Sequence, residues 1–256
     1  MTTRTITRPA ETEALLAALQ DVPPSALTAC GEWTAHDIGA HLAGACEEVT
    51  RHVRAYAEGR PLTATRSFEE REAPFRELSS SRLLAALDRG EETMRAEIGA
   101  VLAREPDADL TWTRRQMRVD AFLTHLRSES AIHRWDLTGD DDVSWRLLGQ
   151  FDLFRHAITA IGSGPMTARG VAAGAAGAGP FAARLRSDGH SDLLVTVGPT
   201  SVELSLSEPE GEPTIVADQA ARLLVLWGRT PQQPSRVLVN GPRAEAFRVR
   251  RLLSGY

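Results

Sequence analysis

Apolar residues in the first 161 positions recur every three or four residues, the spacing of one face of an α-helix. A capping box of Thr34 and Asp37 predicts where the second helix begins. The segment 67–78 is polar and charged, and it predicts a short exposed helix or a loop that covers a site. The predicted helices span 11–20, 34–58, 79–101 (capped by the serines at 79–81), 117–137 and 145–161, with a connection over 106–115. Long amphipathic helices of this kind predict a helical bundle.

The pattern changes after residue 161. Residues 162–180 are rich in glycine and alanine, and they predict a linker or a loop at a domain boundary. Further along the chain, period-two alternation or helical spacing predicts strands over 193–197, 202–206 and 236–240, and helices over 218–227 and 244–253. We therefore predict an α+β protein with a helical bundle over 1–164 and a small α+β domain over 165–256.

Candidate chemistry lies in the segment 117–137. His125, Glu129 and His133 follow one another at intervals of four residues, so they share one face of the predicted helix, and apolar residues flank that face. Burying two imidazoles and a carboxylate is costly unless something compensates them. Two interpretations remain open, a divalent metal ion and a metal-free network in which the carboxylate bridges the histidines. His41, at the edge of the apolar stripe of another predicted helix, is a candidate for a further ligand.

Composition narrows the possible functions. The 29 basic and 34 acidic residues give a formal net charge of -5 without long runs of one sign, which argues against nucleic acid as a partner. The sequence contains no lysine, which excludes Schiff-base, pyridoxal-phosphate and P-loop lysine chemistry. Cys30 and Cys46 are too few for a disulfide framework, and we predict buried apolar roles for both. The absence of a long apolar segment predicts a cytoplasmic protein with no membrane partner.

Three groups of residues carry a resemblance to a known family. They are Trp33-Thr34-x-x-Asp37-Ile38-x-x-His41-Leu42-x-Gly44, Glu129-x-x-x-His133-x-Trp135-Asp136 and Leu223-Leu224-x-Leu226-Trp227-Gly228-Arg229. In these motifs, and over nearly the whole chain, the sequence resembles the mycothiol-dependent maleylpyruvate isomerase family, which is associated with actinobacteria. The resemblance implies a DinB-like up-and-down four-helix bundle followed by a small sterol-carrier-like α+β domain.

The resemblance also implies roles for individual residues. It makes His41, Glu129 and His133 ligands of a divalent metal ion, usually zinc, and it gives Arg229 a place in the active site. The helix geometry agrees, because His125 and His133 lie about 12 Å apart along the axis, too far to bind one ion together. His125 is then predicted to be a neighbour of the ligands or an acid/base group. For Arg229 the alternative is a charge that compensates the C-terminus of its helix.

The predicted function is that of a metal-dependent S-transferase or isomerase that uses a small thiol. A divalent ion deprotonates a coordinated thiol, and two histidines with one carboxylate leave a coordination position open. Because no cysteine is predicted on the metal face, the thiol is expected to be a cosubstrate that attacks a small electrophile. The family resemblance implies that this cosubstrate is mycothiol. The alternatives are a thiol-independent hydrolase or lyase with His125 or Glu48 as base, and a non-catalytic small-molecule-binding protein. A monomer or homodimer is expected.

Overall fold

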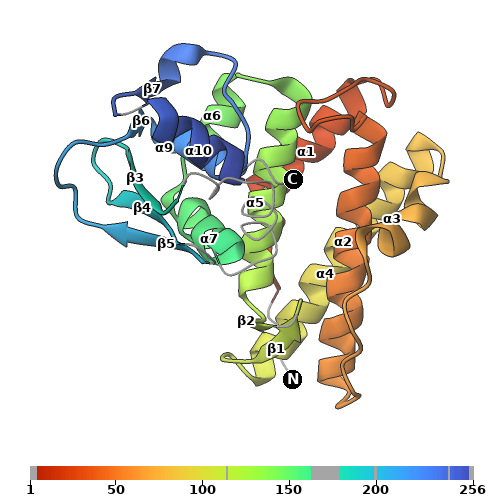
Figure 1. Cartoon of the computed structure of the whole chain (residues 1–256). Coiled ribbons are helices and arrows are strands. Elements are labelled where there is room, and N and C mark those ends of the chain that lie inside the picture. The colour runs from red at the N-terminus through yellow and green to blue at the C-terminus, as the bar shows by residue number, and fades with distance from the viewer. Residues whose placement is uncertain (1–4, 114, 163–178, 199–200, 242, 254–256) are drawn as a thin grey trace. The chain divides into compact units, whose positions relative to one another are not determined.

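The computed structural model describes residues 5–113, 115–162, 179–198, 201–241 and 243–253. Internal contacts divide the chain into two compact units, Met1–Thr138 and Gly139–Tyr256, and each is described by itself. The first unit is mainly helical and the second contains a mixed sheet with helices, which confirms the predicted α+β class (Figure 1). The predicted boundary stretch 162–180 lies largely outside the described residues. The division into 1–164 and 165–256 stays a prediction.

Four long helices form a bundle in the first unit. They are α1 (Ala10–Asp21), α2 (Ala35–Ala57), α4 (Ser80–Arg104) and α5 (Ala121–Thr138). Helix α2 packs along α4 and α1 packs along α5, while the short helix α3 (Phe68–Arg76) lies against α2 (Figure 1). The apolar stripes meet in one core that includes Ile38, Leu87, Ile98 and Phe122. Each such side chain contributes about 1.5–3 kcal/mol on burial, so these stripes stabilise the bundle.

Local capping determines where the helices near the candidate site begin. At the start of α2, Asp37 N donates to Thr34 Oγ1 at 3.2 Å and Thr34 N donates to the Asp37 carboxylate at 2.9 Å, which confirms the predicted capping box. A second capping box, of Ser67 and Glu70, begins α3, and it explains why the charged segment 67–78 contains a helix. Ser79 occupies the N-cap position of α4, but its side chain makes no capping hydrogen bond. The predicted position of the cap is therefore confirmed, without the side-chain hydrogen bond that usually accompanies it.

The connection predicted over 106–115 contains a β-hairpin. Strand β1 (Asp109–Trp112) pairs antiparallel with β2 (Arg115–Arg118). Residues of β1 alternate between exposed and buried, and Leu110 and Trp112 are the buried ones. The strand was not predicted because four residues are too few for this alternation to be recognised in the sequence. Helix α5 consequently begins at Ala121 rather than at Met117, which lies in β2.

The single helix predicted over 145–161 is in fact two helices, α6 (Asp142–Leu148) and α7 (Phe151–Gly162). The first helix ends at Gly149, whose N–H donates to the carbonyl of Trp145 at 3.0 Å. The side chain of Gln150 then donates to the carbonyl of Leu147 at 2.8 Å, which satisfies another free carbonyl of that last turn. Both helices belong to the second unit and pack against its other elements.

The second unit is built on a five-stranded sheet in the order β5-β4-β3-β6-β7, in which only the β3–β6 pair is parallel. Its elements are β3 (Phe181–Arg186), β4 (Asp192–Val197), β5 (Val202–Ser207), β6 (Ile215–Ala217), α9 (Gln219–Leu226), the 3-10 turn η2 (Pro234–Arg236), β7 (Val237–Val239) and α10 (Arg243–Leu253). The three predicted strands and two predicted helices are confirmed. Strands β3 and β6 were not predicted, because β3 carries two arginines and β6 is only three residues long.

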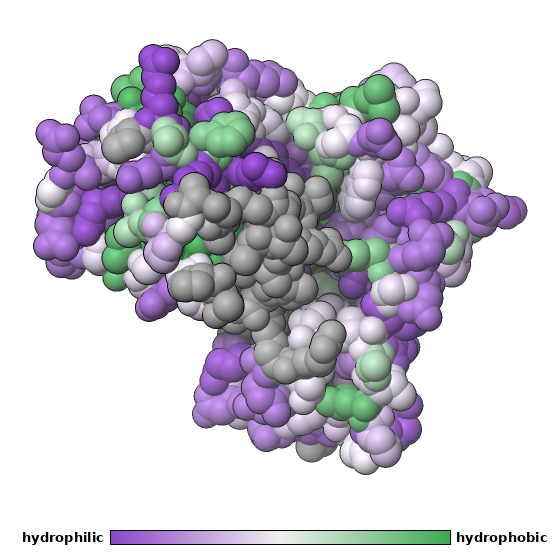
Figure 2. Space-filling view, viewed as in Figure 1, coloured by the Kyte–Doolittle hydropathy of each residue, from purple (hydrophilic) through white to green (hydrophobic). Residues whose placement is uncertain are grey.

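The visible surface is predominantly charged and polar. Over the described residues in Figure 2, hydrophilic side chains predominate and apolar ones are scattered. Exposed ion pairs contribute to this surface, for example Arg54 with Glu97 at 2.8 Å. Within the described ranges, no helix is both long enough and apolar enough to cross a membrane.

Candidate metal centre

Three of the predicted site residues come together between α2 and α5. His41 lies on the second turn of α2, while Glu129 and His133 lie one turn apart on α5. The Oε2 atom of Glu129 is 3.3 Å from His41 Nε2 and 3.5 Å from His133 Nε2. One donor atom from each of these residues lies within 4.8 Å of the others, so the three could hold one metal ion.

Two further carboxylates orient the histidine rings. His41 Nδ1 donates to Glu72 Oε1 at 2.7 Å, and His133 Nδ1 donates to Asp136 Oδ2 at 2.9 Å. Both carboxylate side chains are fully buried. Because a carboxylate only accepts hydrogen bonds, each ring carries a proton on Nδ1 and directs Nε2 toward Glu129. A carboxylate behind a histidine in this way is the usual support of a metal-binding imidazole.

This arrangement brings three electron-rich atoms together, so a positive charge must lie among them. Although burial opposes the charged form, hydrogen bonds to Asp136 and Glu129 raise the pKa of His133 to about 9. Burial would likewise raise the pKa of Glu129, yet the hydrogen bond from His133, the contact with His41 and the charges of the nearby histidines hold it well below its ordinary value. In the absence of a metal, the extra proton on His133 supplies the positive charge. Two imidazole nitrogens and one carboxylate oxygen also fit a divalent cation, and this donor set leaves coordination positions for other ligands.

His125 lies outside this cluster. Its Nε2 is 4.0 Å from the other oxygen of Glu129, Oε1, and its side chain is 29 % exposed. It faces the candidate site from the next turn of α5, as a neighbour of the donor atoms. This placement agrees with the spacing argument that His125 and His133 cannot share one ion.

Aromatic rings surround the two histidines. Trp33 stacks on His133 with ring centroids 6.0 Å apart and an angle of 16° between the rings, and its centroid is 5.0 Å from that of His41. Phe68, at the start of α3, has its ring centroid 5.7 Å from that of His41 and is 52 % exposed. These ring contacts limit how the two imidazoles can rotate, which keeps their Nε2 atoms directed at Glu129.

The sequence left open that the segment 67–78 covers a site, but it did not predict that a residue of α3 supports a ligand. Glu72 lies among several acidic residues of that helix, and its spacing to His41 carries no recognisable signal. The resemblance motif contains Asp136, but no role was predicted for it. Gly44, also in the motif, has a structural reason to be small: a Cβ there would lie 2.8 Å from the carbonyl oxygen of Arg71. The glycine therefore allows α3 to approach α2 closely enough for Glu72 to reach His41.

The predicted apolar role is wrong for Cys30. This residue is only half-buried, and its sulfur lies within 4.8 Å of donor atoms of His133 and Asp136. That grouping contains a single histidine, whose Nδ1 is already bonded to Asp136, so we take the grouping of His41, Glu129 and His133 as the candidate metal centre. Cys46 is fully buried as predicted. Burial, together with the negative charge of Glu91, raises the pKa of the Cys46 thiol to about 12.

Of the two residues suggested as a base, Glu48 is poorly suited. Its carboxylate accepts hydrogen bonds from the side chain of Arg51 and from the backbone and side chain of Arg66. Burial acts against ionisation, but these bonds lower the pKa of Glu48 to about 2. A carboxylate with so low a pKa accepts a proton weakly at neutral pH, which leaves His125 as the better candidate.

Arg229 belongs to the second unit and is described there alone. It follows Gly228, whose φ of 75° provides the left-handed conformation predicted for the end of α9. The Nη1 atom of Arg229 donates to the carbonyl of Trp227 at 2.8 Å, and its backbone N–H donates to the carbonyl of Leu224 at 2.8 Å. These bonds hold the arginine against its own helix terminus. The predicted place of Arg229 in the active site stays a prediction.

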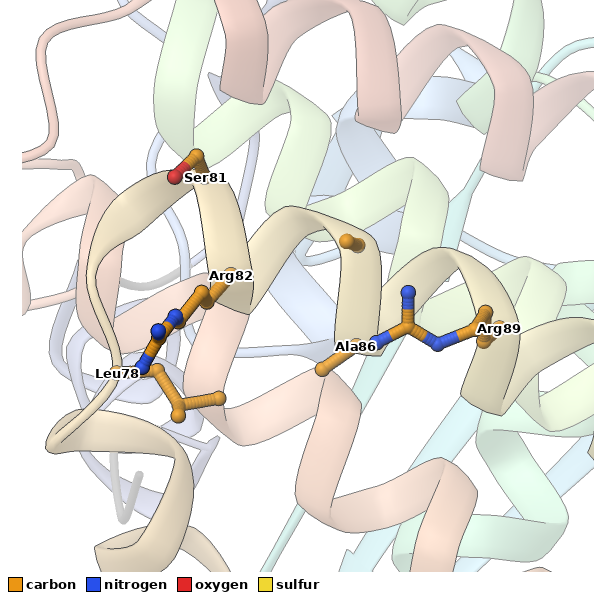
Figure 3. Close-up of a pocket in the computed structure, with 6 residues that line it drawn as sticks. Leu78, Ser81, Arg82, Ala86 and Arg89 are labelled. Atoms are coloured by element: carbon orange, nitrogen blue, oxygen red, sulfur yellow. The ribbon is translucent and has the colours of Figure 1, made fainter.

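A separate groove lies at the start of α4. It has a volume of about 400 Å³ and is lined by Leu78, Ser81, Arg82, Ala85, Ala86 and Arg89 (Figure 3). Its size is within the range of small-molecule sites. The lining residues include no histidine, carboxylate or thiol, so the groove offers none of the chemistry predicted for this protein.

The fold and the candidate site together define a class of protein. A helical bundle joins two histidines and a carboxylate at one point, and a small α+β unit follows it in the chain. Residues 9–138, about half of the chain, match the family model described as the mycothiol maleylpyruvate isomerase N-terminal domain. The chain therefore belongs to this family, which confirms the resemblance seen in the sequence.

Solved structures agree at the level of the fold. The crystal structures of the mycothiol-dependent maleylpyruvate isomerase and of a mutant of that enzyme superpose with TM-scores of 0.60 and 0.61. Each match covers 90 % of this chain and 88 % of the other chain, at 14 % and 13 % sequence identity respectively. At such low identity the likeness establishes the fold alone. None of the curated proteins compared with the chain matches it.

Proposed function

We propose that this protein is a metal-dependent isomerase or S-transferase that uses mycothiol or a similar small thiol to attack an electrophilic substrate. The observation that carries the proposal is the convergence of His41 Nε2 and His133 Nε2 on the Glu129 carboxylate, with a second carboxylate behind each ring. Membership of the mycothiol maleylpyruvate isomerase family supports a thiol-dependent reaction.

In this proposal His41, Glu129 and His133 are the ligands of a divalent metal ion, which we expect to be zinc. When bound, the ion supplies a positive charge that allows a thiol to ionise at neutral pH. Glu72 and Asp136 hold the two imidazoles with their Nε2 lone pairs directed to a common point. Because these carboxylates are buried, water does not compete with them for the Nδ1 protons.

His125 is proposed to move protons. Its partly exposed ring borders the Oε1 side of Glu129, so it can take the proton that the thiol releases and return it when the thiol leaves the product. For an isomerase, the thiolate adds to an electron-poor double bond, the resulting single bond rotates, and elimination restores the double bond and the thiol. For an S-transferase, the thiolate displaces a leaving group and the thioether is the product.

The thiol is proposed to be a cosubstrate rather than a cysteine of this chain. Cys46 is fully buried, and the raised pKa of its thiol makes it a poor nucleophile. Cys30 lies near His133, so Cys30→Ser is the control that separates the two sources of thiolate. The variant should keep its thiol-dependent activity if the nucleophile is external. A cytoplasmic location and a monomeric or homodimeric state remain predictions.

The experiment compares the purified protein with and without zinc, and with and without mycothiol, on maleylpyruvate and a panel of small electrophiles. Isomerisation is followed by absorbance and thioether formation by mass spectrometry. Turnover that needs both the metal and the thiol, and that survives Cys30→Ser, supports the proposal. Turnover that needs the metal but proceeds at full rate without any thiol would favour the hydrolase or lyase alternative. A zinc-loaded protein that turns over nothing in the panel would favour the non-catalytic alternative.

A further inference from the structure

Arg71, on α3, is a buried cation next to the candidate metal centre. Its side chain is only 8 % exposed, and it precedes Glu72, the residue that orients His41. Its Nε atom is 3.9 Å from Glu72 Oε1, the same oxygen that accepts the hydrogen bond from His41 Nδ1. That separation is too long for a hydrogen bond. Among the described residues, no hydrogen-bond partner reaches the buried Nε of Arg71.

The acidic residues around Arg71 are already occupied by other groups. Glu72 accepts hydrogen bonds from His41 and from Arg76 Nη2, the latter at 2.8 Å. Glu48 is bonded to Arg51 and Arg66, and Glu129 faces the two histidines. These three carboxylates attract the guanidinium through space, while Arg66 repels it. Electrostatic attraction alone leaves the buried Nε–H of the guanidinium without an acceptor among the described residues.

The position of the guanidinium is nevertheless well defined. Its central carbon lies 4.3 Å from the centroid of the Phe68 ring, a cation–π contact, and the same ring neighbours His41. On the other side, the Arg71 backbone packs so closely against α2 that a Cβ on Gly44 would clash with it. The arginine is thus held in place without a hydrogen bond from its Nε–H to the described residues, which is the arrangement of a group that is oriented in advance for a ligand.

A buried charge without hydrogen bonds is energetically unfavourable. Burial lowers the pKa of Arg71, and the neighbouring carboxylates only partly oppose this effect. A carboxylate brought by a ligand would remove the cost, because its two oxygens match the fork of N–H donors in a guanidinium. Sulfate and phosphate are less suitable, since three carboxylates near the arginine would repel their higher charge.

We propose that Arg71 is a substrate-binding residue, which hydrogen-bonds a carboxylate group of the electrophile beside the metal centre. This inference rests on the proposed function, which identifies the bound carboxylate compound as a substrate. It adds the residue that holds the acid group: Arg71 binds this group at α3 while the reactive carbon faces His41, Glu129 and His133.

The test measures binding of succinate, a carboxylate that is not itself an electrophile, to the zinc-loaded protein by calorimetry. Succinamide, the uncharged analogue, is the ligand control. The Arg71→Gln variant should bind succinate about 10- to 100-fold more weakly than the unsubstituted protein does, which corresponds to the loss of a charge-assisted hydrogen bond. Arg71→Lys keeps the charge without the fork, so it should bind with intermediate affinity. Arg54→Gln removes an equal charge from α2, at an exposed ion pair with Glu97 of α4, and should have no effect.

The outcomes separate this inference from the proposed function. A loss confined to the Arg71 variants, with zinc content unchanged, supports the carboxylate site even if no thiol-dependent turnover is ever found. Succinate affinity within twofold of the unsubstituted protein in Arg71→Gln refutes the site, even if turnover is intact. The site would also be refuted if the protein bound succinate and succinamide with equal affinity, or if it bound no succinate at all. Loss of zinc from both Arg71 variants would refute it too, because Arg71 would then have a structural role.

Discussion

The proton on His133 leads to a quantitative prediction for metal binding. In the metal-free protein the pKa of His133 is about 9, so the ring is protonated at neutral pH and a metal ion must displace that proton. Between about pH 6.5 and about pH 8.5 the deprotonated fraction of such a group rises about 75-fold, and the apparent zinc affinity should rise with it. A histidine with its ordinary pKa near 6.5 would produce only about a twofold increase over the same interval.

The assay is competition for zinc between the protein and a chelator whose own pH dependence is known. Asp136→Asn is the matched variant, because Asp136 contributes to the raised pKa of His133. The variant should bind zinc more weakly and should also show a clearly smaller increase in affinity with pH. If the unsubstituted protein gains only about twofold across this interval, the proton does not reside on His133, and the assignment of His133 as a ligand loses its main electrostatic support.

The same pKa shift predicts how the stability of the metal-free protein depends on pH. A histidine whose pKa is raised by folding stabilises the folded state fully below its unfolded pKa of about 6.5 and loses that effect as the pH rises through about 9. The expected loss in the free energy of unfolding is about 3 kcal/mol at most. Urea unfolding in the presence of a chelator, at several pH values across this range, measures it. Saturating zinc should remove most of the dependence, since the ion then replaces the proton.

Substitutions separate the roles of the remaining site residues. Glu129→Gln should empty the site, whereas His125→Ala should retain zinc at saturating supply and lose mainly rate; elemental analysis with steady-state kinetics distinguishes them, and the reverse result would refute the assignment of ligands. Glu72→Gln should weaken zinc binding about 10- to 100-fold with little change in melting temperature, because the imidazole of His41 loses its negatively charged acceptor. Arg229→Ala should lower kcat/KM by at least about tenfold with a smaller effect on folding; unchanged turnover would leave Arg229 only its role at the end of α9.

The ligand spacing on α5 was predictable from the sequence because it depends on one helix alone. Residues four apart on a helix lie on the same face whatever surrounds them, so Glu129 and His133 had to be neighbours. His41 was predictable to a lesser degree. The capping box and the apolar stripe define the start and the inward face of α2, which made His41 a candidate ligand. The pairing of α2 with α5 depends on tertiary packing, and the family resemblance was needed to turn that candidate into a prediction.

Where the prediction failed, local signals were weak or competed with one another. The hairpin formed by β1 and β2 has strands of only four residues, too short for period-two alternation to be distinguished from a loop. The break between α6 and α7 depends on Gly149 and on the hydrogen bond from the Gln150 side chain to the helix end. Single glycines also occur inside helices, as Gly90 does in α4, so the sequence pattern could not determine which glycine ends a helix.

The short helix α3 shows why the supporting residues were harder to find than the ligands. Glu72 and Arg71 are consecutive, so they leave the helix about 100° apart, and a spacing argument would assign them to different faces. Both nevertheless serve one site, because the close approach at Gly44 places the helix with Glu72 on His41 while Arg71 remains buried beside Phe68. The position of α3 against α2 therefore determines both the orientation of a metal ligand and the proposed carboxylate site. A larger residue at position 44 should disturb both together, although it touches neither the ligands nor the substrate.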